Sequence, residues 1–585
     1  MSVITIGEVI KRVLEKEGIK YVFGVPGDQP YPLLNAFYGS NIKFITFHHE
    51  ATAAHAADAY ARVTGEIGVV LGTVGPGAAN LIGGVYPAFA EGIPMLVLTA
   101  QNQVNRSYPD KGSMQALDQY SLFKAVTKWN AVIYSWDRVI EIVRRAISVA
   151  YSGRPGPVQV DIPSDILHKN IDEADLIIPE RSVLESIGRP SPPMKSIEKI
   201  AQILATSERP LIHPGGGLMR SGGSEELQII SEYLQIPVVT SISGRGALPE
   251  DSPLSLIPNS YGALAAQTEA DVVLVIGSKL GDLDFFGRPP IWGEYDKQKF
   301  IQVDTLPENI GLNRPVEIGI VADARETLIL LSDVIRSKYP PVSKRERNNF
   351  YKEYERQWLD QFSEQSRSNE VPMHPLRVIS EVRKFYARDS ISVIDGGNTA
   401  VWAHYANRIY KPNSFLSTTS GDSGHLGSGI GFSIGAKLAR PDKDVYCITG
   451  DGAFSMHIGD LETAKRLGLQ VTFIVLNDSA WGMIKSGQTL YYNGNHIGVD
   501  FEDINYAEIA KAMGCFGERI KRPEDITDAL KRAKKSNLPA VLDCEINKEV
   551  IPPDFQTLAS IWLEGCDSPP KAAEKNMEQM AKENS

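Results

Sequence analysis

The sequence predicts an α/β protein built from three doubly wound parallel-sheet domains. The chain has 585 residues, which is too long for one hydrophobic core. Short apolar runs of strand length alternate along it with segments of helical periodicity, a pattern typical of βαβ units. Glycine-rich or acidic turns follow several of these runs, as they do where open parallel sheets bind ligands. We expect domains at residues 1–175, 190–340 and 370–550, followed by a tail at 551–585.

The composition is typical of a soluble globular protein with a net charge of −11. Such an acidic balance argues against nucleic acid or an anionic membrane surface as the main partner. Residues 4–18 lack the unbroken apolar core of a signal peptide, and glycine and proline turns interrupt the apolar region 67–100, so we expect a cytoplasmic protein without a membrane span. The cysteines form no CxxC pair and are expected to be reduced thiols. They are Cys447, Cys515, Cys544 and Cys566.

In the first domain, polar residues follow two of the strand-like runs. These runs are Tyr21 to Gly24, Phe44 to Phe47, Gly68 to Thr73, Met95 to Thr99 and Val158 to Ile162. Glu50 comes after the second run and leads into a helix over Ala53 to Arg62. A glutamate at a helix start is favoured by the helix dipole, so its position alone leaves its role open. Asp28 lies in a glycine-proline turn after the first run, where turn chemistry alone also accounts for it.

The second domain contains a glycine run that suits either a nucleotide or a tight turn. Its strand-like runs are Pro210 to Ile212, Pro237 to Thr240, Val272 to Ile276 and Phe300 to Val303. Gly215, Gly216 and Gly217 would let a pyrophosphate approach the backbone, and Asp304 follows a strand within reach of a ribose. Both interpretations stay open. Residues 341–370 are rich in charge and predict a solvated connecting helix.

The third domain carries two aspartates at neighbouring strand ends. Asp451 follows the run Val445 to Thr449 within Gly-Asp-Gly, and Asp478 follows the run Val471 to Leu476. Helix capping explains an isolated Gly-Asp-Gly equally well. The paired arrangement instead favours a clamp for a metal and a diphosphate, because carboxylates offer the hard oxygen ligands that Mg²⁺ prefers.

The order of these motifs resembles the family of thiamine diphosphate-dependent enzymes. The signature of that family is Gly-Asp-Gly, a helix and a strand, and then Asn-Asn, for which this chain has Asn477-Asp478. The resemblance implies that Asp451, Asp478 and the main-chain carbonyl of Ala480 hold Mg²⁺. It extends over nearly the whole chain, and it implies a pyrimidine-binding domain, a central domain and a diphosphate-binding domain.

The resemblance also implies the contacts to the cofactor. Glu50 matches the glutamate that protonates the aminopyrimidine ring, and Leu426 stands in place of the bulky apolar residue that bends the cofactor into a V. The other implied contacts are Gly397, Asn398, Thr399, Gly424, Gly452, Ala453, Trp481 and Gly482. In the family, the glutamate and the clamp belong to different subunits, so a homodimer or homotetramer with active sites between subunits is implied.

Within the family, the chain most resembles the acetolactate synthase large subunit, in a group with pyruvate oxidases and 2-hydroxyacyl-CoA lyases. Gln115 matches a glutamine of acetolactate synthases, and Ser113-Met114-Gln115 stands where pyruvate-type decarboxylases carry a His-His pair. We expect decarboxylation of pyruvate or another 2-oxo acid and transfer of the acyl carbanion to an acceptor. Asp28, Gln115 and Trp481 are the candidates to orient the substrate.

Two departures from the acetolactate synthase pattern leave alternatives open. The flavin motif Arg-Phe-Asp-Asp-Arg is replaced by Lys279 to Asp282, so the central domain could hold FAD, ADP or nothing. The Gln-Trp-Gln motif after the clamp is replaced by Ser486-Gly487-Gln488. The alternative functions are a carbon-carbon lyase that acts on an acyl-CoA substrate, such as a 2-hydroxyacyl-CoA lyase or an oxalyl-CoA decarboxylase, a pyruvate oxidase-like enzyme, and a non-catalytic homologue.

Overall fold

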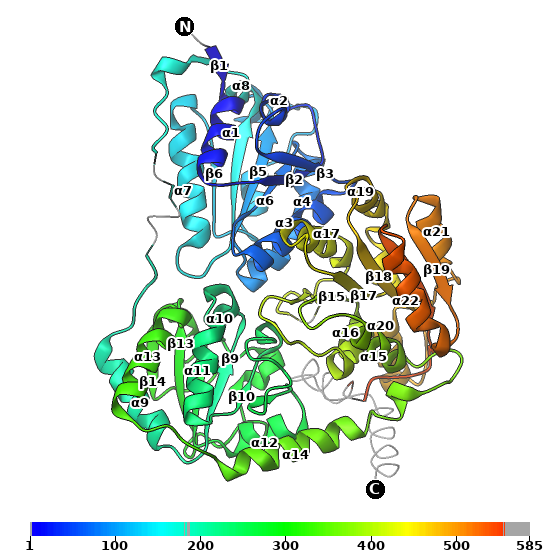
Figure 1. Ribbon diagram of the computed structural model, residues 1–585. Coiled ribbons are helices and arrows are strands. Elements are labelled where there is room, and N and C mark those ends of the chain that lie inside the picture. The colour runs from blue at the N-terminus through cyan, green and yellow to red at the C-terminus, as the bar shows by residue number, and fades with distance from the viewer. Residues whose placement is uncertain (1–2, 181, 184–187, 420, 554, 556–585) are drawn as a thin grey trace.

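The computed structural model describes residues 3–180, 182–183, 188–419, 421–553 and 555. These residues form three domains, each built on a parallel sheet. Within these residues, each sheet has six strands, all paired in parallel. Parallel neighbours need a crossover connection, here mostly helical, and the helices cover the faces of each sheet (Figure 1). The predicted fold class is thereby confirmed. In this described part of the chain, no helix combines the length and the apolar character needed to cross a membrane.

The first sheet lies at the top of Figure 1, in blue and cyan, with the strand order β3-β2-β4-β5-β7-β6. Its strands are β2 (Tyr21–Gly24), β3 (Lys43–Thr46), β4 (Gly68–Gly72), β5 (Met95–Gln101), β6 (Trp129–Val132) and β7 (Pro157–Pro163). The helices are α1 (Ile6–Lys16), α2 (Tyr31–Phe37), α3 (Glu50–Thr64), α4 (Pro76–Glu91), α5 (Val104–Ser107), α6 (Gln119–Phe123), α7 (Val139–Tyr151) and α8 (Ser164–Leu167). An antiparallel pair, β1 (Val3–Thr5) and β8 (Asn170–Asp172), joins the two ends of the domain.

The second sheet, in green, has the order β11-β10-β9-β12-β13-β14. Its strands are β9 (Pro210–Pro214), β10 (Val238–Val239), β11 (Ser255–Leu256), β12 (Val272–Ile276), β13 (Lys299–Asp304) and β14 (Ile318–Val321). Its helices are α9 (Met194–Thr206), α10 (Gly216–Ser221), α11 (Ser224–Leu234), α12 (Tyr261–Glu269) and α13 (Ala324–Lys338). The predicted connecting helix is α14 (Glu346–Asp360), but it is not solvated all round. Tyr351 and Trp358 are buried because α14 packs along α12 and reaches the core of the third domain.

The third sheet, in yellow to orange, has the order β16-β15-β17-β18-β20-β19. Its strands are β15 (Ile391–Asp395), β16 (Phe415–Ser417), β17 (Val445–Gly450), β18 (Val471–Asn477), β19 (Phe516–Ile520) and β20 (Ala540–Glu545). Its helices are α15 (Pro375–Phe385), α16 (Gly397–Ala406), α17 (Gly429–Ala439), α18 (Asp451–Ser455), α19 (Leu461–Arg466), α20 (Gly482–Tyr491), α21 (Tyr506–Ala512) and α22 (Ile526–Lys535). The three cysteines within the described residues, Cys447, Cys515 and Cys544, are free and buried. Cys566 and most of the predicted tail lie outside the described residues.

In every sheet, the winding of the chain reverses at an equivalent place. The chain passes from the first central strand to one edge and then returns to the other side of that strand. The reversals lie between β2 and β4, between β9 and β12, and between β15 and β17. Ligands of open α/β sheets bind at such a switch point, outside the carboxyl ends of the strands. The fold therefore offers three equivalent crevices.

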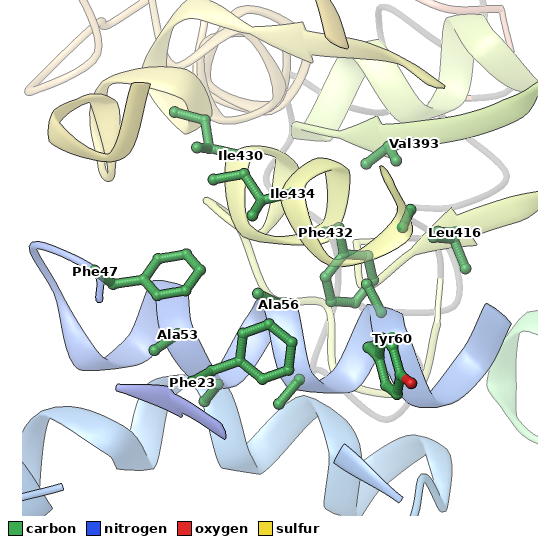
Figure 2. Close-up of a cluster of buried hydrophobic side chains, with 14 of the residues drawn as sticks. Phe23, Phe47, Ala53, Ala56, Tyr60, Val393, Leu416, Ile430, Phe432 and Ile434 are labelled. Carbon is green, nitrogen blue, oxygen red and sulfur yellow. The ribbon is translucent and has the colours of Figure 1, made fainter. Parts of the chain in front are cut away.

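The first and third domains share one hydrophobic core. Helix α3 lies along α17, and Figure 2 shows Ala56 of α3 on the side toward Phe432 of α17. The backbones of the two helices are in contact, since a Cβ atom on Gly435 would lie 2.1 Å from the Ala56 carbonyl oxygen. Close packing of this kind fixes the two domains relative to each other within one chain.

Glu91, the last residue of α4, connects all three domains. Its side chain is buried, with 2% of the residue exposed. The Ser243 hydroxyl of the second domain donates to Glu91 Oε2 at 3.1 Å, and the backbone N–H of Asp422 in the third domain donates to Oε1 at 2.6 Å. A Cβ atom on Gly421 would collide with the same carboxylate. The junction of the domains is thus organised around one buried carboxylate.

Candidate active site

The crevice of the third sheet contains a cavity of about 270 Å³ between the ends of β15 and β17. Every cofactor contact that the sequence places in the third domain lines this cavity. These residues are Gly397, Asn398, Thr399, Gly424, Leu426, Asp451, Gly452, Ala453, Asp478, Ala480, Trp481 and Gly482. Residues from four separate segments thus meet in one pocket, and their individual roles stay proposals.

Two carboxylates, those of Asp451 and Asp478, face each other in this pocket. Asp451 is 2% exposed and accepts a hydrogen bond from the Gly452 N–H at 2.9 Å. Burial and then the charge of Asp478 raise the pKa of Asp451, and burial likewise raises the pKa of Asp478. Without a bound cation, ionisation of either carboxyl group is therefore unfavourable. A divalent cation between them would remove this cost.

The backbone around Asp478 is shaped for close approach. Ser479 has a positive φ of 52°, and a Cβ atom on Gly482 would lie 2.6 Å from Asp478 Oδ2. The Trp481 N–H donates to the Val499 carbonyl at 2.8 Å, and the Phe501 N–H donates to the Ser479 carbonyl at 2.7 Å. This pairing holds the turn that carries the Ala480 carbonyl in a fixed place beside the two aspartates.

The donor set suits Mg²⁺ and a diphosphate. Within the described residues, no group of three His, Cys, Asp or Glu side chains could hold a metal by itself. As a ligand set, Asp451, Asp478 and the Ala480 carbonyl would leave coordination positions for other oxygen ligands, as Mg²⁺ sites that bind substrate phosphates do. The Asn398 side-chain oxygen in the same pocket is buried and has no hydrogen-bond partner in the described part of the chain. Each of these groups is an oxygen ligand or acceptor, so the pocket fits the group that the resemblance implies.

The candidate residues of the first domain gather at a different crevice, that of the first sheet. Glu50 lies in the first turn of α3 with 7% exposed, and the Asn80 amide donates to its Oε2 at 3.0 Å. A Cβ atom on Gly77, at the start of α4, would lie 3.2 Å from Glu50 Oε1. Glu50 is therefore packed against the beginning of α4 and does not line the pocket of its own chain.

Asp28 and Gln115 lie at the same crevice as Glu50. Asp28 follows β2, is exposed, and accepts a hydrogen bond from the Tyr31 hydroxyl at 3.3 Å. Gln115 is exposed and has a positive φ of 61°. A Cβ atom on Gly75, after β4, would lie 2.4 Å from the Gln115 carbonyl oxygen. The structure thus assembles the candidates into two groups, one at the first crevice and one at the third.

Four histidines form a cluster that the sequence did not reveal. His49 and His55 come from the start of α3, and His425 and His457 come from the third domain. Ring centroids lie 5.0 Å apart for His49 and His457, 5.0 Å for His55 and His425, and 5.7 Å for His55 and His457. Neither ring nitrogen of His55 has a hydrogen-bond partner within the described residues. The only signal in the sequence was four histidines at distant positions, which no local pattern connects.

Burial keeps three of the four rings in this cluster neutral, those of His55, His425 and His457. It lowers the pKa of His55 well below the ordinary value, and the charges of His425, His457 and His49 lower it further. Burial also lowers the pKa of His425, and it lowers the pKa of His457 to about 4. At neutral pH, these three rings pack as uncharged groups between the first and third domains.

The crevice of the second sheet contains a cavity of about 620 Å³ where the three domains meet. Its lining includes Arg154, Gly216, Arg220, Lys279, Asp304 and Asp422. The glycine run is partly explained by packing, since a Cβ atom on Gly215 would lie 2.3 Å from the Gly277 carbonyl. Asp304 accepts a hydrogen bond from the Leu306 N–H at 2.8 Å and so belongs to a turn. Arg220 makes no hydrogen bond or ion pair among the described residues, and burial lowers its pKa to about 10.

The fold and the third crevice together define a class of protein that holds a diphosphate-bearing cofactor through a divalent cation. Models of the thiamine pyrophosphate enzyme family match the chain in three parts: the N-terminal TPP binding domain at residues 4–122, the central domain at 197–331 and the C-terminal TPP binding domain at 395–544. The protein belongs to the thiamine pyrophosphate-dependent enzymes.

Curated relatives align over nearly the whole chain. A probable acetolactate synthase large subunit of Methanocaldococcus jannaschii is 34% identical over 571 residues, which cover 92% of this chain and 91% of the relative. One from Methanococcus aeolicus is 33% identical over 92% of both chains. The acetolactate synthase large subunit of Corynebacterium glutamicum is 30% identical over 93% of this chain and 87% of its own length.

Proposed function

We propose that the protein is a thiamine diphosphate- and Mg²⁺-dependent carboligase that decarboxylates pyruvate or a related 2-oxo acid and transfers the acyl unit to an acceptor. The observation that carries this proposal is the pair of buried Asp451 and half-buried Asp478 at the switch point of the third sheet, where both line a cavity. The acetolactate synthase names of relatives that align over 92% of the chain support the reaction type.

In this proposal, the third domain holds the diphosphate end of the cofactor. Asp451, Asp478 and the Ala480 carbonyl are the ligands of Mg²⁺, and Leu426 packs beneath the cofactor rings. The remaining contacts are made by Gly397, Asn398, Thr399, Gly424, Gly452, Ala453, Trp481 and Gly482. When bound, thiamine diphosphate supplies a nucleophilic carbon and an electron sink for the decarboxylation of a 2-oxo acid.

Glu50 has the role of holding a proton for the aminopyrimidine ring. The hydrogen bond from the Asn80 amide to Oε2 orients the carboxyl group and leaves Oε1 for the cofactor. Because Glu50, Asp28 and Gln115 do not line the pocket of their own chain, a second copy has to supply them. We therefore propose a homodimer, or a homotetramer made of such dimers, in which the first crevice of one subunit faces the third crevice of the next.

Transfer to an acceptor is favoured over release of an aldehyde. Release requires protonation of the acyl carbanion, and no histidine is among the residues that line the described pocket. Gln115 and Asp28 offer an amide and a carboxylate at the mouth of the first crevice, where they would orient the carboxylate and carbonyl of 2-oxo acids. Trp481 provides an apolar wall on the opposite side.

Product analysis tests this reaction. The protein would be incubated with thiamine diphosphate, Mg²⁺ and labelled pyruvate, with and without a second 2-oxo acid, and the products identified by mass. A labelled 2-hydroxy-3-oxo acid together with carbon dioxide is expected. Acetaldehyde alone, peroxide or acetyl phosphate formed with oxygen, or turnover only with an acyl-CoA would replace the proposal by the decarboxylase, pyruvate oxidase or acyl-CoA lyase alternative.

We also propose that the cavity of the second sheet binds a nucleotide through its phosphates. Arg220 is a half-buried cation without a hydrogen-bond or ion-pair partner among the described residues, and Arg154 and Lys279 line the same cavity. Such a set of cations attracts a diphosphate. The absorption spectrum of the purified protein decides between FAD and a nucleotide without flavin, and nucleotide analysis of the denatured protein would identify ADP. Absence of both would reject this proposal.

A further inference from the structure

A fully buried polar network lies beneath the first crevice, between the sheet and the segment that carries Gln115. Its members come from β5, β7 and α6, and each is at most 2% exposed. They are Thr99, Gln101, Gln119, Gln159 and Asp161. Buried polar groups of this kind stabilise one arrangement only when every donor finds an acceptor.

Four side chains of this region donate hydrogen bonds to Asp161. The Thr99 hydroxyl donates to Oδ1 at 2.8 Å, and the Gln119 amide donates to the same oxygen at 2.5 Å. The Tyr108 hydroxyl and the Gln101 amide lie 3.3 and 3.4 Å from Oδ2. Only an ionised carboxylate accepts at both oxygens without needing to donate.

The direction of the Thr99 hydroxyl is itself fixed by a neighbour. The Gln159 amide donates to the Thr99 oxygen at 2.6 Å, so the Thr99 proton is directed to Asp161. Burial raises the pKa of Asp161 to about 6, while the hydrogen bonds lower it. The titratable groups that face Asp161, Tyr108 and Tyr134, both have raised pKa values and stay neutral. The carboxylate is therefore ionised at neutral pH and protonated below about pH 6.

The side chains of Gln101, Asn102 and Gln119 also hold the backbone around the first crevice. The Gln119 side-chain oxygen accepts from the Gly75 N–H at 2.8 Å. The Gln101 amide donates to the Leu117 carbonyl at 3.1 Å, and the Asn102 amide donates to the Met114 carbonyl at 2.9 Å. These bonds fix the segment on both sides of Gln115, at the point where Gly75 approaches its carbonyl oxygen.

We propose that Asp161 is a positioning residue for the reaction: its carboxylate orients Gln101 and Gln119, and these hold Gly75 and the Gln115 segment in place at the first crevice. This inference rests on the proposed function, because it assigns a purpose to the position of Gln115. The effect reaches Glu50 as well, since Gly75 begins α4, which carries the Asn80 amide that binds Glu50.

Asp161→Asn is the direct test, because the substitution keeps the shape but places an NH2 group against donors. We expect kcat/KM for the 2-oxo acid to fall about 10- to 100-fold, since small displacements of positioning groups have effects of this size. The affinity for thiamine diphosphate and Mg²⁺ should change less than about twofold, because the third-domain pocket is untouched. With Mg²⁺ and thiamine diphosphate at saturating concentrations, kcat/KM of the wild type should decline below about pH 6, and Asp161→Asn should lack this acid limb of the pH profile.

Asp58→Asn serves as the matched control. Asp58 is also 0% exposed in the first domain, but it pairs with Arg62 at 2.6 Å on α3. Its loss should lower thermal stability and leave the acid limb in place. If Asp161→Asn does not fold, Thr99→Val removes one donor from the network, and we expect it to lower kcat/KM by about 3- to 10-fold.

Hydrogen-deuterium exchange at residues 112–119 separates this inference from the proposed function, because it requires no substrate. Faster exchange there in Asp161→Asn, with unchanged exchange in the third domain, is expected. Faster exchange in a protein that turns over no 2-oxo acid would sustain the positioning of the segment and reject the proposed function. Unchanged exchange, or a folded Asp161→Asn with wild-type kcat/KM and an intact acid limb, would overturn the inference.

Discussion

The aspartate pair and the histidine cluster are two groups of like side chains, each partly or fully buried, that lie near each other in the structure yet behave in opposite ways. Leu426 lines the pocket that contains Asp451 and Asp478, whereas the preceding residue, His425, faces His55 in the cluster. Burial raises the pKa of the two acids and lowers the pKa of His55, His425 and His457. In both places the charged form is disfavoured.

The two groups differ in how each avoids a buried charge at neutral pH. An imidazole needs only to lose a proton, which costs little near pH 7, so the cluster is stable as packed neutral rings. The carboxyl groups of Asp451 and Asp478 would have to stay protonated or find a cation, and they line a cavity where a cation has room. A buried pair of acids beside a cavity therefore indicates a ligand, whereas buried imidazoles alone do not.

The largest expected effect comes from removing one acid of the pair. Asp451→Ala deletes a direct metal ligand, so Mg²⁺-dependent binding of thiamine diphosphate should weaken by about 100-fold or more, as measured by calorimetry. Asp478→Asn is the control for Asp451→Ala, because it keeps an oxygen ligand and removes only the charge repulsion between the two carboxylates. It should still bind the cofactor, and the protein without ligand should be more stable. Unchanged affinity in Asp451→Ala would refute the clamp.

The contribution of the histidine cluster to the pH dependence of stability is tested most directly by substituting His457. Its pKa of about 4 lies below the ordinary value of 6.5, so the folded protein binds fewer protons than the unfolded chain. This part of the stability is complete above pH 6.5 and is lost as the pH falls toward 4. His457→Asn should therefore lose less stability between pH 7 and pH 5, by up to about 2 kcal/mol in urea unfolding. His496→Asn, which removes an exposed ring outside the cluster, is the control, and equal acid sensitivity of both variants would reject the explanation.

The aspartate pair, whose pKa values are raised and not lowered, should make the affinity for Mg²⁺ depend on pH. Because the folded pKa values of Asp451 and Asp478 are raised, protons compete with the metal at neutral pH. The affinity should increase with pH, by at most about tenfold per unit for each proton displaced, and level off once both groups are ionised. Titrations of Mg²⁺ from pH 6 to 9 measure this, and Asp478→Asn should flatten the curve. A pH-independent affinity in the wild type would show that both carboxyl groups are already ionised before Mg²⁺ binds.

A smaller effect on Mg²⁺ affinity is expected at Gly482, where the absence of a side chain leaves room for the Asp478 carboxylate. Gly482→Ala places a methyl group 2.6 Å from Asp478 Oδ2, so the carboxylate has to move by a few tenths of an ångström. We expect a 3- to 10-fold loss of Mg²⁺ affinity, on the order of 1 kcal/mol. Gly487→Ala in the same helix is the control, since its methyl group would meet only Phe555 at 3.7 Å. Equal affinities for all three proteins would show that the turn adapts freely.

Local patterns in the sequence were sufficient for the central strands and for the third crevice. Buried parallel strands are continuous apolar runs, and a polar residue directly after such a run marks the carboxyl edge of a sheet. The strands of the three six-stranded sheets that were not predicted include five edge strands, β6, β11, β14, β16 and β19. Edge strands are short and partly exposed, so their residues show no unbroken apolar run.

The histidine cluster and the Asp161 network could not be predicted because their members share no local pattern. His55 and His425 meet only because α3 lies along α17, and Asp161 and Gln119 meet only because β7 and α6 fold over the same sheet edge. Asp28, Glu50 and Gln115 were singled out by the family resemblance. Their roles stay predictions, while the structure places all three at the first crevice.

The buried carboxylate of Glu91 limits how such a protein can be rebuilt from parts. A chimaera that takes its first domain from one relative and the others from another must bring a donor equivalent to Ser243 and a residue as small as Gly421 to the same point. Otherwise an acid is left in the interior without partners, at a cost of several kcal/mol. Although each sheet has the strand order of an independent unit, the three are expected to be exchangeable between relatives only together.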